Sequence, residues 1–184
     1  MSIRPKIKHT IQSTFRKGLV LVVFLLIGTG KIYSQSNEAD IKAMFLFNFI
    51  KYVEWPKEQE ASVFKIGIVG KSSVSDALQK VIAMKKKEGK KLELVQLNPE
   101  NAPTCQLVFV TAGEESHGEM WAKQYQGRGV LLVSEESEHS EKWAAINLVK
   151  VENKIRFVIN LSAAKSGGIK ISSQLSSLAI LVNP

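Results

Sequence analysis

The sequence predicts an α/β fold: a layered sandwich with a mostly parallel sheet flanked by helices, and a C-terminal antiparallel hairpin at the edge of the sheet. Two observations and one general rule predict it. Short apolar segments alternate along the chain with amphipathic ones, which is the order of a parallel sheet connected by helices. Right-handed crossovers then place helices on both faces of that sheet. Near the C-terminus, Glu152-Asn153 separates two apolar runs, which is typical of a hairpin turn.

Six segments have the composition of strands. The segment 64–70, FKIGIVG, ends at a glycine, and the segment 107–111, LVFVT, is nearly continuous in apolar character. Such continuity is expected of a strand that is covered on both faces. The remaining strands are expected at 92–97, 129–134, 145–151 and 154–161.

Helices are expected between and beside these strands. They span residues 36–53, 74–87, 114–126, about 138–143 and about 172–182. The first has Ser36 or Asn37 as its N-cap and acidic residues in its first turn, where the helix dipole favours them. Ser73 is a candidate cap of the second helix, and Ser172 or Ser173 of the last. With no internal repeat and no clear linker, residues 35–184 form one predicted domain.

The stretch AMFLFNFIKYVEWP, residues 43–56, raises the question of a membrane segment. At about 100° per residue, most of its apolar side chains fall within half of the helix circumference, opposite Asn48, Lys51 and Glu54. Charged side chains are costly in hydrocarbon, so the pattern indicates an amphipathic helix and not a membrane span. Pro56 ends the helix, because the residue before a proline disfavours the α region.

The N-terminus has the pattern of a secretory signal peptide. Residues 1–17 carry five basic side chains and no acidic one, and an uncharged apolar run, GLVLVVFLLIGTG, follows at 18–30. The run has about 13 residues, fewer than the roughly 20 that span a bilayer. Ser34 supplies the small residue before a cut, so residues 1–34 are predicted to be removed and the mature chain to be exported. The alternative is an uncleaved N-terminal anchor.

The strongly basic composition belongs mostly to this leader. The whole chain has a formal net charge of +8, with 25 basic and 17 acidic residues. Six of the basic residues and none of the acidic ones precede the cut, which leaves a net charge of about +2 on the mature chain. A nucleic-acid partner is therefore not predicted. The lysines between 85 and 91 are read as a solvated turn in preference to a phosphate-binding patch.

No set of residues predicts catalysis, a metal or a cofactor. The single cysteine, Cys105, stands before a strand and is expected to be a small buried residue. GIVGKSS at 67–73 lacks the first glycine of a phosphate-binding loop, since Lys65 occupies that position. His117 and His139 lie in acid-rich turns without metal-ligand spacing. We therefore predict no catalytic residues, no metal site and no cofactor.

Two blocks of the sequence resemble a known family. FNFIKYVEWP after a signal peptide, and INLVKVENKIRFVINLSAAKSGGIKISSQLSSLA near the C-terminus, are similar to the YfiR/HmsC-like family of exported proteins. KIGIVG and GVLLVSEESE match the strands between them, so the resemblance covers nearly the whole mature chain. Two features depart from the family. Members often carry cysteine pairs, whereas this chain has only Cys105, and Ala144-Ala145 replaces a common Gly-Gly pair.

The resemblance implies a periplasmic regulatory protein and not an enzyme. Relatives repress a membrane-bound diguanylate cyclase by binding its periplasmic sensor region, which limits cyclic di-GMP signalling and biofilm formation, and they are dimeric. The expected partners are therefore such a membrane signalling protein and a second copy of the chain. In relatives the hairpin and the C-terminal region contribute to partner contact.

Four residues are predicted to contact the partner. Met44 and Phe47 interrupt the polar side of the first helix, where either another element covers them or a partner does. Arg156 and Phe157 are adjacent on a strand, so one of them faces outward. For Phe157, packing in the core is the simpler interpretation.

Two other functions are kept as alternatives. The first is a periplasmic module that binds a small ligand or a cell-wall fragment with loops at the carboxyl ends of strands, near Ser72, Thr111 and Ser134. The second is a hydrolase that uses Cys105 or a histidine. Neither alternative has a motif in its favour.

Overall fold

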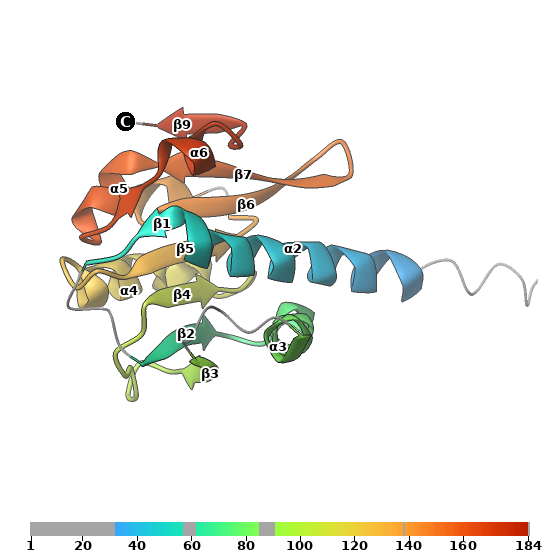
Figure 1. The fold of residues 1–184 in the computed structure, drawn as a ribbon, viewed down its shortest axis with the longest axis horizontal. Helices are drawn as coiled ribbons and strands as arrows, with labels where there is room; N and C mark the ends of the chain where they lie inside the picture. The colour runs from blue at the N-terminus through green and yellow to red at the C-terminus, as the bar shows by residue number, and fades with distance from the viewer. Residues whose placement is uncertain (1–31, 57–61, 85–90, 138, 184) are drawn as a thin grey trace, which may run out of the picture. The chain divides into compact units, whose positions relative to one another are not determined.

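A mostly parallel sheet runs through the centre of the protein (Figure 1). The computed structural model describes residues 32–56, 62–84, 91–137 and 139–183, and the predicted signal peptide lies almost entirely outside them. Within the described residues the sheet has seven strands in the order β3-β2-β4-β5-β6-β7-β9. The strands are β2 (Val63–Val69), β3 (Lys91–Leu97), β4 (Leu107–Val110), β5 (Leu131–Glu135), β6 (Ile146–Val151), β7 (Lys154–Asn160) and β9 (Leu181–Asn183).

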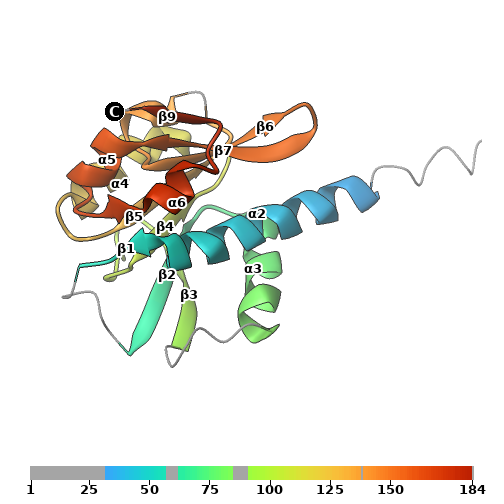
Figure 2. The same cartoon turned by 45° about the horizontal axis from the view of Figure 1, so that its top comes forward.

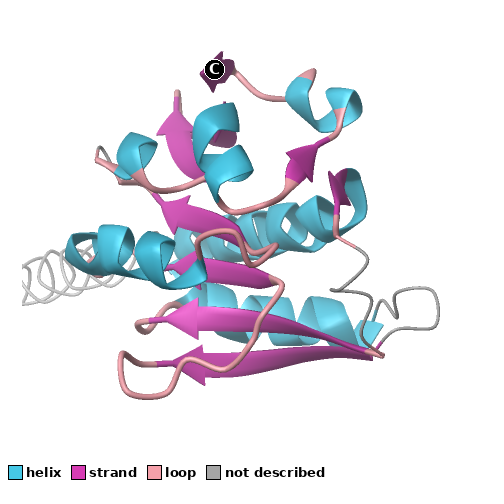
Figure 3. Ribbon diagram, turned by 90° about the vertical axis from the view of Figure 1, so that its left-hand side faces the viewer, coloured by secondary structure: helices cyan, strands magenta, loops and turns pink. Residues whose placement is uncertain are grey.

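The helices lie on both faces of this sheet, as predicted (Figure 3). They are α2 (Ile32–Tyr52), α3 (Ser73–Met84), α4 (Gly118–Tyr125), α5 (Leu161–Ser166) and α6 (Ser173–Ser176), with short 3-10 turns η2 (Glu115–His117) and η3 (Ser140–Lys142). A small antiparallel sheet pairs β1 (Val53–Glu54) with β8 (Lys170–Ile171). None of the helices in the described ranges is long and apolar enough to cross a bilayer.

The protein has a larger and a smaller hydrophobic core, and strand β4 contributes side chains to both. Leu107 and Phe109 belong to the larger core, under α2 and α3, whereas Val108 and Val110 belong to the smaller core, under α4. Successive side chains of a strand point to opposite faces, so a strand between two helical layers must be apolar throughout. All four residues are buried, which confirms the interpretation of LVFVT.

The predicted hairpin is confirmed. β6 and β7 are antiparallel, and Glu152 and Asn153 between them both have positive φ, 48° and 61°. Positive φ at both central residues is the geometry of a type I′ turn, whose twist matches that of the strands it joins. The hairpin is not the edge of the sheet, however, because β9 pairs with β7 in parallel and lies outside it.

Three expectations about helix ends were wrong. Helix α3 begins at Ser73 itself, and the residue that caps it is Ser72, whose hydroxyl accepts a hydrogen bond from the backbone N–H of Val74. The last helix was expected at about 172–182, but α6 ends at Ser176, and Leu181–Asn183 forms strand β9. Strand β9 gains backbone hydrogen bonds from β7, which a local pattern does not reveal. At the other end of the domain α2 begins at Ile32, so Ser36 and Asn37 lie within the helix and do not cap it. The Ser172 cap is confirmed, since its hydroxyl accepts a hydrogen bond from the backbone N–H of Leu175.

Candidate partner-binding surface

A groove lies between α2, β7 and the segment that contains α6, which are neighbours in both ribbon views (Figure 2). Its volume is about 350 Å³. The side chains from α2 are Phe45, Asn48, Phe49 and Tyr52. Those from β7 are Ile155, Arg156 and Phe157, and those from the α6 segment are Leu175 and Leu178. The lining is therefore apolar and aromatic except for Asn48 and Arg156.

Helix periodicity explains why α2 presents this wall. Phe45, Asn48, Phe49 and Tyr52 stand at positions i, i+3, i+4 and i+7, so they lie along the same side of the helix. The rings of Phe45 and Phe49 meet the ring of Phe157 edge to face, with centroids 5.5 and 5.2 Å apart. These contacts fix the floor of the groove, while Leu178 at its rim leaves 57% of its surface exposed.

The structure brings together two of the four predicted contact residues. Arg156 and Phe157 both line the groove, although Phe157 is only 2% exposed and packs mainly in the core. Met44 and Phe47 are not part of the groove. They are half-buried and pack against the larger core, on other sides of α2, since Phe47 lies about 200° around the helix from Phe45. The aromatic spacing that lines the groove was present in the sequence, but the wall opposite it was not predictable.

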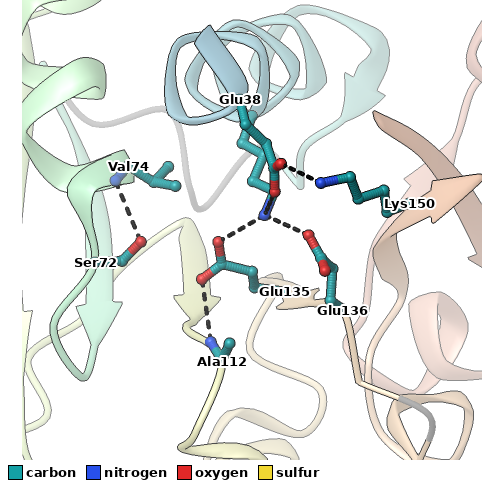
Figure 4. Close-up of polar contacts among 8 residues, drawn as sticks. Glu38, Ser72, Val74, Ala112, Glu135, Glu136 and Lys150 are labelled. Atoms are coloured by element: carbon teal, nitrogen blue, oxygen red, sulfur yellow. Dashed lines mark hydrogen bonds and ion pairs between the residues drawn. The ribbon is translucent and has the colours of Figure 1, made fainter. Parts of the chain in front are cut away.

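A second feature of α2 is a buried ammonium group, that of Lys42. Lys42 is 5% exposed and forms ion pairs with Glu38 at 2.8 Å, Glu135 at 3.0 Å and Glu136 at 2.5 Å (Figure 4). Glu135, at the end of β5, also accepts a hydrogen bond from the backbone N–H of Ala112. Lys150 on β6 completes the cluster with a 2.7 Å ion pair to Glu38.

This cluster holds α2 on the carboxyl end of the sheet. Burial opposes the charge on Lys42, but hydrogen bonds to Glu136 and Glu38 outweigh it and hold the pKa of Lys42 above its usual range. Hydrogen bonds from Lys150 and Lys42 lower the pKa of Glu38 to about 2. Lys42 and Glu38 are thus both charged at neutral pH, and the ion pairs of the cluster fix the helix that forms one wall of the groove.

The cluster predicts a pH dependence of stability. Because the pKa of Glu38 is lower in the folded state than its ordinary value of 4.5, its contribution is complete above pH 4.5 and is lost as the pH falls toward 2. We expect the free energy of unfolding, measured with urea at each pH, to decrease more steeply in this range for the wild type than for Glu38→Gln. Parallel curves for the two proteins would contradict the assignment.

The residues proposed for a small-ligand site already have structural roles, with one exception. The Ser72 hydroxyl accepts a hydrogen bond from the N–H of Val74 at the start of α3, and the Ser134 hydroxyl donates one to the Asn147 side chain at 2.7 Å. Of these three hydroxyls, only that of Thr111 is buried without a hydrogen-bond partner in the described residues. It is enclosed, since a Cβ atom at Gly70 would lie 2.3 Å from it. The hydroxyls of Ser72 and Ser134 are therefore already hydrogen-bonded within the protein and offer little to a ligand.

Cys105 is a buried structural residue, as predicted. It is 0% exposed, and burial raises the pKa of its thiol to about 11, although Lys65 acts in the opposite direction. A thiol that stays protonated at neutral pH is a poor nucleophile. We expect iodoacetamide to label Cys105 at pH 7.5 only in urea-unfolded protein, as measured by mass spectrometry. Rapid labelling of the folded protein would reverse this conclusion.

The two histidines do not join a site. His117 is exposed and pairs with Glu114 at 3.1 Å, and His139 is exposed before η3. Across the described ranges there is no group of three or more His, Cys, Asp or Glu side chains that would hold a metal ion. In the described residues, neither Cys105 nor the two histidines form the nucleophile–base pair that the hydrolase alternative needs.

Comparison with solved structures gives a likeness of fold. The ABC domain in complex with L-Trp from Streptococcus pneumoniae superposes with a TM-score of 0.51 at 14% sequence identity. The match covers 79% of this chain and 60% of that one, so the chain spans about 60% of the length of that structure. Comparison with curated protein sequences gives no match.

The family comparison covers most of the domain. The model of the YfiR/HmsC-like family matches residues 39–180, from the first turns of α2 to the segment after α6. This span includes every element that lines the groove and every residue of the buried ion cluster except Glu38. The family is one of periplasmic regulators of cyclic di-GMP signalling, and it is regulatory and not catalytic. The chain belongs to the YfiR/HmsC-like family.

Proposed function

We propose that this protein is exported to the periplasm and represses a membrane-bound signalling protein of the diguanylate-cyclase type by binding its periplasmic sensor region. The observation that carries the proposal is the apolar groove, because it combines fixed aromatic walls with an exposed leucine at its rim. Apolar surface of this kind is expected where a second protein binds. Family membership supports the periplasmic and regulatory parts of the proposal.

Repression is a shift of a conformational equilibrium in this proposal. A bound protein changes the balance between active and inactive forms of its partner only by binding one of them more tightly. The groove and its neighbouring surface would therefore fit the inactive form of the sensor region. Arg156 and Phe157 stay in the proposal as residues of the groove, with Phe157 acting through the shape of the groove floor. Met44 and Phe47 lie on other sides of α2, so they would contact the partner only outside the groove.

The proposal is tested by deleting the gene and measuring cyclic di-GMP and biofilm mass. We expect both to rise, and expression of the full chain with its leader to restore them. Crosslinking in intact cells should attach the mature protein to a membrane protein that has a cyclase domain. Unchanged cyclic di-GMP, together with no membrane partner in the crosslinked fraction, would refute the proposed function.

Two further parts of the proposal have their own measurements. Fractionation and N-terminal sequencing should find the mature chain in the periplasm, beginning at Gln35. Light scattering of the purified mature chain should give the mass of a dimer. A cytosolic full-length chain would refute the export prediction, and a monomer at micromolar concentration would refute the dimer.

A further inference from the structure

We propose that the groove binds an amphipathic helix of the partner, and that this helix carries acidic side chains beside its apolar face. This inference rests on the proposed function and specifies the chemistry of the partner at the groove. Three observations support it: the length and direction of the α2 wall, the positions of exposed apolar side chains, and the charges beside the groove.

The α2 wall has the form that receives another helix. It runs from Phe45 to Tyr52, which is two helical turns, or about 10 Å. Helices that bind in grooves insert apolar side chains from positions such as i, i+3, i+4 and i+7, which also cover about two turns. A small-molecule pocket is likewise mostly apolar, but it encloses most of its ligand. The lining here has three polar groups, those of Asn48, Tyr52 and Arg156, and Leu178 at its rim is 57% exposed, so the groove leaves room for a longer occupant.

Exposed apolar side chains extend the groove at its rim and along α2. Leu178 is 57% exposed on the α6 side. Ile41 precedes Phe45 by one turn on the same side of α2 and is 40% exposed. Burial of such side chains under a partner is favourable by about 25 cal/mol for each Å² removed from water. The apolar surface is therefore longer than the closed part of the groove, which suits a helix better than a single inserted side chain.

The charges beside the groove are positive. Arg156 lines it and forms no ion pair with any described residue. The ammonium group of Lys51 lies 5.5 Å from the centre of the Tyr52 ring, which is itself part of the lining. Glu54 in β1, the first acid after Tyr52 in the sequence, is already paired with Lys170 at 2.9 Å. Acidic side chains on the partner helix would complement this surface.

The test uses two labelled helical peptides of equal length and equal leucine stripe. One carries glutamates beside the stripe and the other carries lysines at the same positions. Fluorescence anisotropy measures their binding to the mature protein. We expect the glutamate peptide to bind about fivefold more tightly than the lysine peptide, and Arg156→Glu to reduce or reverse this ratio.

The matched variants are Leu178→Asp and Leu181→Asp. The two leucines are almost equally exposed, 57% and 54%, but only Leu178 lines the groove. Leu181 faces a different hollow, formed by the open side of β6, β7 and β9. We expect Leu178→Asp to weaken binding of the glutamate peptide about tenfold and Leu181→Asp to leave it within about twofold.

Three results would overturn the inference. The first is that neither peptide binds at about 1 mM, a concentration at which even weak complexes form. The others are equal binding of the two peptides and equal effects of the two leucine variants. Complementation of the deletion strain separates this inference from the proposed function. If Leu178→Asp and Leu181→Asp both restore normal cyclic di-GMP at equal protein levels, repression stands and the groove is not its site. If the wild-type gene has no effect on cyclic di-GMP, the function itself fails.

Discussion

Replacement of Lys42 by methionine is expected to lower the free energy of unfolding by about 3–5 kcal/mol. The substitution keeps most of the apolar stem of the side chain but removes the cation that faces Glu38, Glu135 and Glu136. Glu135 is 7% exposed, so its carboxylate would be left buried without its counter-ion. The cost comes mainly from that unpaired charge and less from the lost attraction. Urea unfolding followed by tryptophan fluorescence measures it.

Two variants serve as controls for this effect. Lys170→Met removes an ion pair with Glu54 in which both side chains are more than half exposed, and it should change stability by only about 0–1 kcal/mol. Lys42→Met combined with Glu135→Gln removes both buried charges, so it should recover part of the loss. A Lys42→Met protein as stable as the Lys170→Met protein would show that the cluster does not hold α2 in place.

Replacement of Phe157 by alanine is expected to cost about 3–5 kcal/mol. The ring is 2% exposed and lies edge to face with the rings of Phe45 and Phe49, so its removal leaves a cavity between β7 and α2. Edge-to-face pairs contribute about 0.5–1.5 kcal/mol beyond their buried area, which adds to the loss. Thermal and urea unfolding should both report it.

The neighbouring residue Arg156 provides the comparison. Its side chain is exposed, and Arg156→Ala should change stability by less than about 0.5 kcal/mol. Phe157→Leu should be milder than Phe157→Ala, because the larger side chain fills part of the cavity. A loss of partner binding in Phe157→Leu without a loss of stability would indicate that the ring itself contacts the partner. Equal stabilities of the alanine variants at 156 and 157 would show that Phe157 is not a core residue.

Most of the secondary structure was predictable because it depends on local patterns. The apolar continuity of 107–110 identified a strand covered on both faces, and the Glu152-Asn153 pair identified a hairpin. The C-terminal end was predicted incorrectly because Leu181–Asn183 becomes a strand only through its pairing with Val158–Asn160. A helical pattern extrapolated from Ser172 does not contain that information.

The candidate site was predictable only in part. The sequence identified Arg156 and Phe157 as partner-contact candidates, and both line the groove. It also favoured Met44 and Phe47, which α2 turns away from the groove. Whether an apolar residue of a helix is exposed depends on what packs against it, and here that is decided by β7 and α6, more than 100 residues further along the chain.

The sequence by itself determined the α/β class, the order of most elements, the amphipathic character of the first helix and the family resemblance that the comparison confirmed. The tertiary structure decided that Lys42 is buried, because its partners Glu135 and Glu136 are 93 and 94 residues away. It also decided that the aromatic side of α2 faces a groove. The physical reason is that periodicity reports the faces of an element, whereas burial and charge pairing depend on which distant elements meet those faces.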